Sequence, residues 1–174
     1  MDVRARHDDI ATLVLTEIVA GFRELKRDGD RALAQLDPAD WQARLDPESN
    51  SIAVLVRHLD GNLRSRFSDF LTTDGEKPSR DRDDEFEDAD LGPEQLRAVW
   101  ERGWDRLFAT LDTLGPDDLT REVTIRGESH TVVQALRRSL LHVARHIGQI
   151  VLLAKHRRGS DWSTLTLPRR GRGA

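Results

Sequence analysis

The chain has 174 residues, of which 33% are charged and 37% are hydrophobic, and its formal net charge is −4. This length can bury a core, the composition is too polar for a membrane protein, and the modest negative charge predicts no general attraction to nucleic acid or anionic lipid. The chain contains no cysteine, which excludes disulfides, cysteine-ligated metals and a protein thiol nucleophile.

The N-terminal segment has basic residues followed by an apolar patch, a pattern that also occurs in signal peptides. Asp8, Asp9 and Glu17 interrupt this pattern, and no apolar run is long enough to span a bilayer. We therefore expect a cytoplasmic protein that does not associate with a membrane.

Helical periodicity predicts a first helix over about residues 9–36, which Pro38 ends. The second helix is predicted to begin at Ser49 or Asn50, either of which can cap it, and to continue to about Leu71. Both helices have an apolar stripe, formed by Ile10, Leu13, Val14, Ile18, Phe22 and Leu25 in the first and by Ile52, Leu55, Leu59, Leu63, Phe67 and Phe70 in the second.

A charged stretch over residues 72–92 precedes the third helix, which is predicted to begin at Pro93 and to end at Gly115-Pro116. Alternating residues around Arg126-Gly127 indicate a short hairpin or an irregular turn. The fourth helix follows Thr131 and ends near residue 159. We expect the tail after about residue 160 to be loosely ordered; a weak nucleic-acid tail is the less favoured reading.

Four long amphipathic helices predict an all-α four-helix bundle, with residues 1–174 forming a single domain. The connection between the second and third helices is unusually long for neighbouring antiparallel helices. Such a long crossover can return along the bundle, which lets these two helices point in the same direction.

The fourth helix contains His142 and His146, which are four residues apart and therefore lie on one face with Cβ atoms about 5–6 Å apart. Both histidines are predicted on the shoulder of the apolar stripe, together with Gln149, and away from an outer face that carries Arg137, Arg138 and Arg145. A paired spacing of this kind suits two ligands of one ion, but two packed or exposed histidines also have it.

The second helix supplies a third histidine, because His58 lies on a similar shoulder of its own stripe. Asn62 and Asp69 follow on the same side, and Arg66 lies near the middle of the stripe. Three inward imidazoles can form a facial set that suits zinc, nickel, iron or copper and leaves coordination positions open. The alternative is that His58 is a hydrogen-bonded core residue.

Other histidines and acidic residues give weaker signals. His7, His130 and His156 are predicted to face solvent, and the acidic run over residues 81–90 is predicted to be an exposed charged loop. The fourth helix lacks the glutamate of the HExxH metalloprotease pattern, and the chain contains no P-loop and no Gly-x-Ser-x-Gly elbow.

With these residues in place, the chain resembles the DinB/YfiT-like superfamily of metal-dependent bundle proteins, and in particular one of its domain-of-unknown-function branches. The resemblance rests on two blocks, SIAVLVRHLDGNLRSRFSDFLTTDGEKPSRDRDDEF and LLHVARHIGQI, in this order. It implies an up-down-down-up topology and a three-histidine site for one divalent metal that maps onto His58, His142 and His146.

The resemblance also implies an activity, because some members are thiol S-transferases or thiol-dependent isomerases that use bacillithiol, mycothiol or glutathione. Dimers are frequent among them, so we expect a homodimer. The leading hypothesis is a metal-dependent transferase that activates a low-molecular-weight thiol for attack on a small-molecule substrate. Asn62 and Gln149 would orient water or substrate, and Arg66 would pair with a substrate carboxylate or with Asp69.

Three alternatives remain at this point. A metal-dependent hydrolase needs a general base near the ion, and the sequence pattern assigns no carboxylate to that role. A non-catalytic metal-binding stress or interaction protein would have a closed site or no substrate cavity. A bundle in which the histidines serve only for packing would bind no metal.

Overall fold

The computed structural model describes residues 3–167, and the side chains of residues 9–167. It consists of four long helices, a small two-stranded antiparallel sheet and short 3-10 turns. The helices are α1 (Val3–Leu33), α2 (Ile52–Phe67), α3 (Pro93–Leu111) and α4 (Val132–Arg158), and the strands are β1 (Glu122–Ile125) and β2 (Glu128–Thr131). The predicted helical bundle is thus confirmed in outline, and the two strands form a short hairpin around Arg126-Gly127, which is one of the two possibilities that the sequence indicates there.

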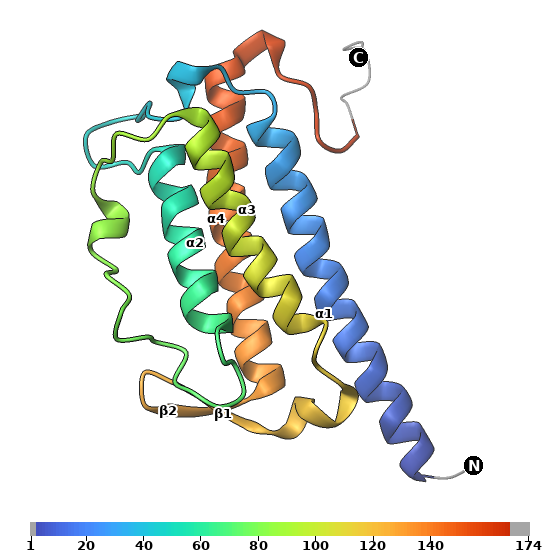
Figure 1. Cartoon of the computed structure of the whole chain (residues 1–174). Helices are drawn as coiled ribbons and strands as arrows, with labels where there is room; N and C mark the ends of the chain where they lie inside the picture. The colour runs from blue at the N-terminus through green and yellow to red at the C-terminus, as the bar shows by residue number, and fades with distance from the viewer. Residues whose placement is uncertain (1–2, 168–174) are drawn as a thin grey trace.

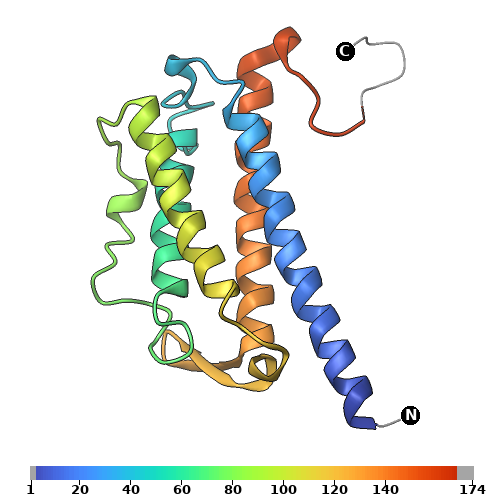
Figure 2. The ribbon, with the colours of Figure 1, turned by 45° about the vertical axis from the view of Figure 1, so that its right-hand side comes forward.

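The helices lie side by side, and Figures 1 and 2 show their directions. From their N-terminal ends, α1 and α4 run upward in Figure 1, whereas α2 and α3 run downward. The connection over residues 68–92 returns along the outside of α2 to the start of α3. Within the described residues, no helix is both long and apolar enough to cross a membrane.

Local interactions explain where α2 and α4 begin. The Ser51 hydroxyl accepts a hydrogen bond from the Val54 amide at 3.2 Å and caps α2. The prediction of Ser49 or Asn50 as the cap is therefore wrong by one or two residues. Thr131 and Gln134 form a reciprocal capping box at the start of α4, because each side chain bonds the other residue's backbone amide.

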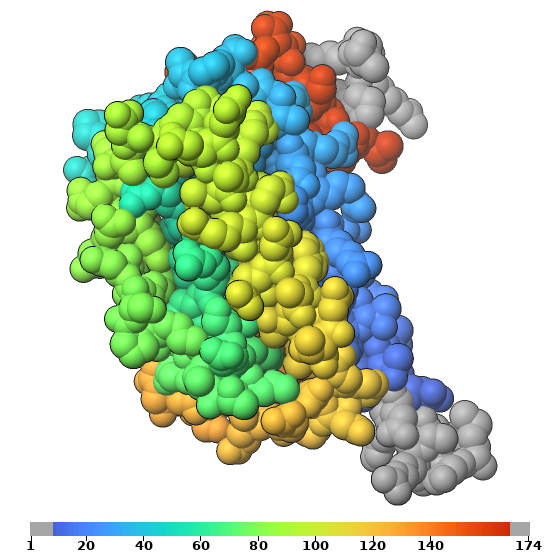
Figure 3. Space-filling model, in the orientation of Figure 1, coloured from blue at the N-terminus to red at the C-terminus, as the bar shows by residue number. Residues whose placement is uncertain are grey.

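The second helix is the most deeply buried element of the bundle. Thirteen of its sixteen residues are buried, because α3, α4 and the 68–92 connection cover it from several sides. Figure 3 shows this connection and α3 over α2, which reaches the surface of that face only between them. On the α3 side the approach depends on Gly103, where an added Cβ would lie 2.8 Å from the Asp60 Cα atom.

Side-chain hydrogen bonds hold the 68–92 connection against α2. The Ser65 hydroxyl donates to the Gly75 carbonyl at 2.8 Å and accepts from the Lys77 amide at 3.0 Å. Farther along, Arg57 pairs with Asp84 at 2.7 Å. These contacts, from both halves of α2, fix the path of the connection over the helix.

The hairpin closes one end of the bundle. Its two-residue turn has positive φ at both Arg126 (57°) and Gly127 (75°), as a tight antiparallel hairpin requires. The Asp74 carboxylate accepts hydrogen bonds from both turn amides, at 2.9 and 2.8 Å. The hairpin and the 68–92 connection are therefore joined beside the N-terminal end of α4.

The segment after α4 packs along α1 as far as it is described. Arg31 donates to the Leu165 carbonyl at 2.5 Å, and the Gln35 side chain pairs with the backbone of Ser163. The basic tail considered as a weak nucleic-acid segment lies mainly at 168–174, outside the described residues.

Candidate metal centre

The three histidines predicted from the sequence come together between α2 and α4. His58 is 4% exposed, and His142 and His146 are partly buried on adjacent turns of α4. One ring nitrogen of each residue lies within 4.8 Å of the other two. The closest pair, Nε2 of His58 and Nε2 of His142, is 3.2 Å apart.

A buried carboxylate orients His58. Glu85, in the short turn η2 (Asp84–Phe86), accepts a hydrogen bond from His58 Nδ1 at 2.9 Å. The Phe86 ring packs against the same imidazole, with centroids 4.7 Å apart. This pairing leaves Nε2 of His58 directed toward His142, and a carboxylate behind a ligating histidine is a common way to fix its tautomer.

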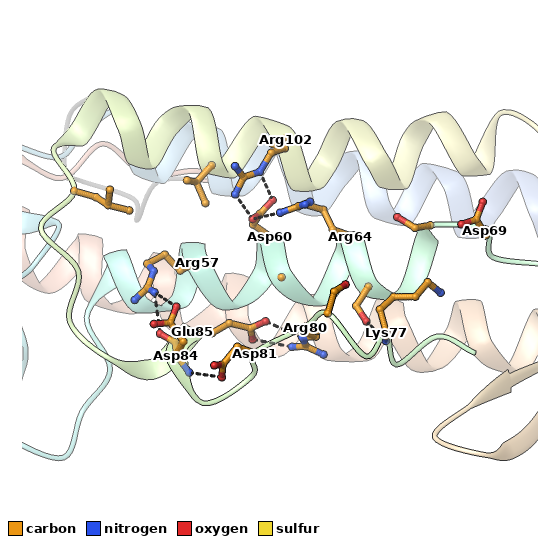
Figure 4. A pocket seen from close by; sticks show the side chains of 16 residues that line it. Arg57, Asp60, Arg64, Asp69, Lys77, Arg80, Asp81, Asp84, Glu85 and Arg102 are labelled. Carbon is orange, nitrogen blue, oxygen red and sulfur yellow. Dashed lines mark hydrogen bonds and ion pairs between the residues drawn. The ribbon is translucent and has the colours of Figure 1, made fainter. Parts of the chain in front are cut away.

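The Glu85 carboxylate is itself held by Arg80, whose Nε and Nη2 atoms donate to its two oxygens at 2.7 Å each. Figure 4 shows Arg80 and Glu85 joined in this way. Burial opposes ionisation of Glu85, but the hydrogen bonds from Arg80 and His58 outweigh it and lower the pKa of the carboxyl group. Glu85 is therefore an anion whose two oxygens are both occupied.

The approach of Glu85 to α2 requires a glycine. A Cβ atom added to Gly61 would lie 1.9 Å from Oε1 of Glu85. Since Gly61 is one turn from His58 on the same helix, the missing side chain provides the space in which the carboxylate reaches the imidazole.

The α4 histidines are restrained differently. His146 donates from Nδ1 to Oε1 of Gln149 at 2.8 Å, which leaves its Nε2 atom free as a ligand. Burial lowers the pKa of His146, and this hydrogen bond offsets only part of the effect. Burial, followed by the neighbouring His146, His58 and two arginines, lowers the pKa of His142 to about 3. Both imidazoles are consequently neutral at neutral pH, which is the form that binds metal.

A cavity of about 340 Å³ opens beside the three histidines. Asn62 and Ser139 line it and are 7% and 6% exposed, yet neither side chain has a hydrogen-bond partner within the described residues. The polar atoms of these two side chains reach the cavity and are not fully buried, so they are available to a ligand. Six arginines also line the cavity: Arg66, Arg80, Arg82, Arg126, Arg138 and Arg145.

Two sequence predictions about these arginines are wrong: the pairing of Arg66 with Asp69, and the position of Arg138 and Arg145 on a face away from the histidines. The pairing of Arg66 with a substrate carboxylate stays a prediction. Arg66 pairs with Glu76 at 2.9 Å and with the Gly75 carbonyl, not with Asp69, which begins the following turn with a φ of 48°. Arg138 and Arg145 are exposed, as expected for an outer face, but they line the histidine cavity instead of pointing away from it.

The acidic run over residues 81–90 is only partly the exposed loop that the sequence indicates. Glu85 is 7% exposed and contacts the site, whereas Asp81, Asp83 and Asp84 are exposed. The signal in the sequence is slight: Glu85 is followed by an aromatic residue that packs against His58. Of the other histidines, His156 is exposed as predicted, His130 is partly buried, and the side chain of His7 is outside the described residues.

The arrangement fits a divalent transition metal. A tetrahedral ion with bonds of about 2.0–2.1 Å to nitrogen separates its ligands by about 3.3 Å, which the closest pair of histidines already matches. The cluster has no fourth histidine, aspartate or glutamate among the described residues. Three protein ligands beside a cavity are typical of a site with an open coordination position.

A second cavity of about 540 Å³ lies on the other side of Arg80, between α2, α3 and the 68–92 connection. Figure 4 shows that its lining carries both signs of charge, and that Asp60 pairs there with Arg102 and Arg64. These charged groups form ion pairs with one another. Among the described residues, no cluster of three or more metal-binding side chains occurs in this cavity.

The fold and the histidine set define a helical-bundle protein with a candidate metal centre that faces an arginine-lined cavity. The chain belongs to the family described as a protein of unknown function (DUF1572), which it matches over residues 9–171. No curated protein and no solved structure matches the chain.

Proposed function

We propose that the protein binds one divalent transition metal, such as zinc, nickel or iron, through His58, His142 and His146, and that it is a metal-dependent enzyme. The observation that carries this proposal is the convergence of three imidazole nitrogens within 4.8 Å of one another. Two features support it further: hydrogen bonds to Glu85 and Gln149 orient two of the imidazoles, and a cavity adjoins the set.

We also propose that the family is a branch of the DinB/YfiT-like superfamily. The parallel directions of α2 and α3, with the crossover between them, support this assignment, as do the positions of the histidines on α2 and α4. Homodimer formation and a cytoplasmic location remain predictions from the sequence.

The activity that we favour is transfer of a low-molecular-weight thiol to an electrophilic small molecule. A bound divalent ion supplies Lewis acidity, which lowers the pKa of a thiol. In the transfer, sulfur forms a bond to an electrophilic carbon, the leaving group departs with its electron pair, and the thiol proton passes to solvent. Asn62 and Ser139 would position the reactants from the cavity wall, while His58 and His146 stay fixed by Glu85 and Gln149.

The state of Glu85 makes hydrolysis the weaker alternative. A metal-dependent hydrolase needs a base near the attacking water. Glu85 is the carboxylate that contacts the site, but Arg80 and His58 donate hydrogen bonds to its oxygens and lower its pKa, which makes it a weak base for a water molecule. A purely metal-storing role is also less favoured, because the cavity leaves room for a substrate.

The test is metal content per chain by elemental analysis, after expression without an affinity tag. We expect about one equivalent in the wild type and a loss of metal in His58→Ala and in His142→Ala. His156→Ala is the matched control, because His156 is exposed on the same helix as His142 and is outside the cluster. The loaded protein should then accelerate conjugation of a thiol to a model electrophile.

Absence of metal from the wild type after reconstitution with zinc, nickel and iron would refute the metal proposal. Equal conjugation rates for loaded wild type and for His142→Ala would refute the transferase and leave a metal-binding protein without this activity.

A further inference from the structure

The histidine cavity is strongly cationic. Six of its lining residues are arginines, and none is an aspartate or a glutamate. The protein as a whole has a formal net charge of −4, so this concentration of positive charge is local. A cavity of one sign of charge attracts ligands of the opposite sign.

Four of these six arginines already have partners. Arg82 pairs with the neighbouring Asp83 at 3.7 Å. Arg66 and Arg126 bind Glu76 at 2.9 and 2.7 Å, and Arg80 binds Glu85. These three hold the wall of the cavity together, because both carboxylates come from the 68–92 connection. Carboxylates of the protein itself therefore neutralise the charges of these three arginines.

Arg138 and Arg145 are different. Neither forms an ion pair or a side-chain hydrogen bond anywhere in the described part of the chain. On α4, Arg138 is four residues before His142 and Arg145 is three residues after it, so both lie on the same side of the helix as this histidine. They present unpaired guanidinium groups on both sides of the candidate metal centre.

Asn62 and Ser139 add neutral polar groups at the floor of the same cavity. Both are more than nine-tenths buried and line the cavity without a hydrogen-bond partner among the described residues. An anion that entered the cavity would thus meet charged donors at the rim and an amide and a hydroxyl deeper inside.

We propose that the substrate of this site is a small molecule with a carboxylate or phosphate group, which Arg138 and Arg145 bind at the rim while Asn62 and Ser139 contact it at the floor. Guanidinium groups match the geometry of both kinds of anion. The volume of about 340 Å³ is at the lower end for small-molecule sites, which favours a compact ligand. This inference rests on the proposed function, because it names the substrate class of the same site.

The test is calorimetric binding of succinate, inorganic phosphate and succinamide to the full chain, in metal-free and zinc-loaded samples at one ionic strength. Succinamide has nearly the shape of succinate without the charge. We expect succinate or phosphate to bind more tightly than succinamide. The double variant Arg138→Gln/Arg145→Gln should bind the preferred anion at least about tenfold more weakly.

Arg137→Gln is the matched control, since Arg137 is exposed next to Arg138 but does not line the cavity. We expect its anion affinity to stay within about twofold of the wild type. Tighter binding of succinate would assign the carboxylate class, and tighter binding of phosphate the phosphate class.

Equal anion affinity in the double variant and in Arg137→Gln would overturn the inference, as would equal binding of succinate and succinamide. Metal content measured on the same samples separates the two proposals. Loss of anion selectivity in a protein that holds metal refutes only the substrate class. Arginine-dependent anion binding in a protein that holds no metal refutes only the metal proposal.

Discussion

Each histidine of the cluster has a different environment. A buried carboxylate accepts a hydrogen bond from His58, and an amide oxygen accepts one from His146. His142 has no such partner among the described residues, but burial and positive neighbours lower its pKa. The two α4 imidazoles therefore stay neutral at a pH at which a solvent-exposed histidine begins to take up a proton. These two imidazoles can therefore bind metal without first releasing protons.

Because His142 stays neutral in the folded state, the stability of the metal-free protein depends on pH. In the unfolded chain His142 takes up a proton near pH 6.5, whereas in the folded chain it does so only near pH 3. Between these values the unfolded state binds more protons, so the free energy of unfolding falls as the pH falls. We expect a slope of at most about 1.4 kcal/mol per pH unit for each such histidine.

Urea denaturation at pH 7, 6 and 5 measures this slope. The window stays above the range in which Glu76 titrates, because the pKa of that carboxyl group is lowered to about 2 in the folded state from its ordinary value of 4.5. His142→Asn should flatten the dependence, and His156→Asn should not. The same slope in all three proteins would show that burial does not keep His142 neutral.

The residues of the site were predictable to different extents. His142 and His146 follow from helical spacing, and His58 from its position on a second stripe, because a helix maps sequence onto faces directly. Glu85 was not predictable in this way. Its role depends on where a connection of irregular structure lies over α2, and it belongs to a run of acidic residues that look alike in sequence.

At the scale of elements, the site depends on the fit between α2 and the 68–92 connection. Glu85 lies beside Gly61, where an added methyl group would collide with the carboxylate. Gly148, in the middle of α4, is a contrasting case, because an added Cβ would have no atom within 4 Å.

Gly61→Ala and Gly148→Ala should accordingly have opposite effects. Alanine favours a helix over glycine by about 0.8–1.0 kcal/mol, so Gly148→Ala should raise the melting temperature. Gly61→Ala should lower it, since overpacking typically costs about 1–3 kcal/mol. It should also weaken zinc binding by about tenfold or more, because the displaced Glu85 no longer orients His58.

Thermal denaturation and competitive zinc titration measure the two effects, and limited trypsin digestion at Arg80 and Arg82 reports release of the connection. Zinc affinity in Gly61→Ala equal to that in Gly148→Ala would show that Glu85 does not support His58.

The helices themselves were predictable from apolar periodicity, but several of their ends were not. The structure has α1 beginning at Val3, before the predicted residue 9, and α3 ending at Leu111, before the predicted Gly115. The first helix ends at Leu33 instead of Leu36, because its last turn tightens into bonds between residues three apart, such as Leu36 N to Leu33 O at 3.3 Å. The second ends at Phe67 instead of Leu71, because Asp69 adopts positive φ and the chain turns there. Neither event leaves a clear periodic signal.

At the scale of the whole molecule, the helices form two closely packed pairs. Contacts are concentrated between α2 and α3 and between α1 and α4, whereas α2 and α4 meet less extensively. The histidine cluster joins α2 and α4, since His58 belongs to one helix pair and His142 and His146 belong to the other. A bound ion would therefore link the two halves of the bundle.

This position predicts that zinc stabilises the whole fold. A ligand that binds only the folded state at a hundred times its dissociation constant raises the free energy of unfolding by about 2.7 kcal/mol. For a domain of this size, that corresponds to a rise in melting temperature of about 5–11 °C. We expect the rise in the wild type and in His156→Ala, whose exposed histidine is outside the cluster.

His58→Ala keeps two histidines on α4 but cannot connect that helix to α2, so its melting temperature should respond little to zinc. Differential scanning calorimetry with and without zinc distinguishes these cases. An equal rise in His58→Ala and the wild type would mean that zinc stabilises the fold without bridging the helix pairs. A small rise in His58→Ala beside a full one in His156→Ala would attribute the stabilisation to the link that His58 provides.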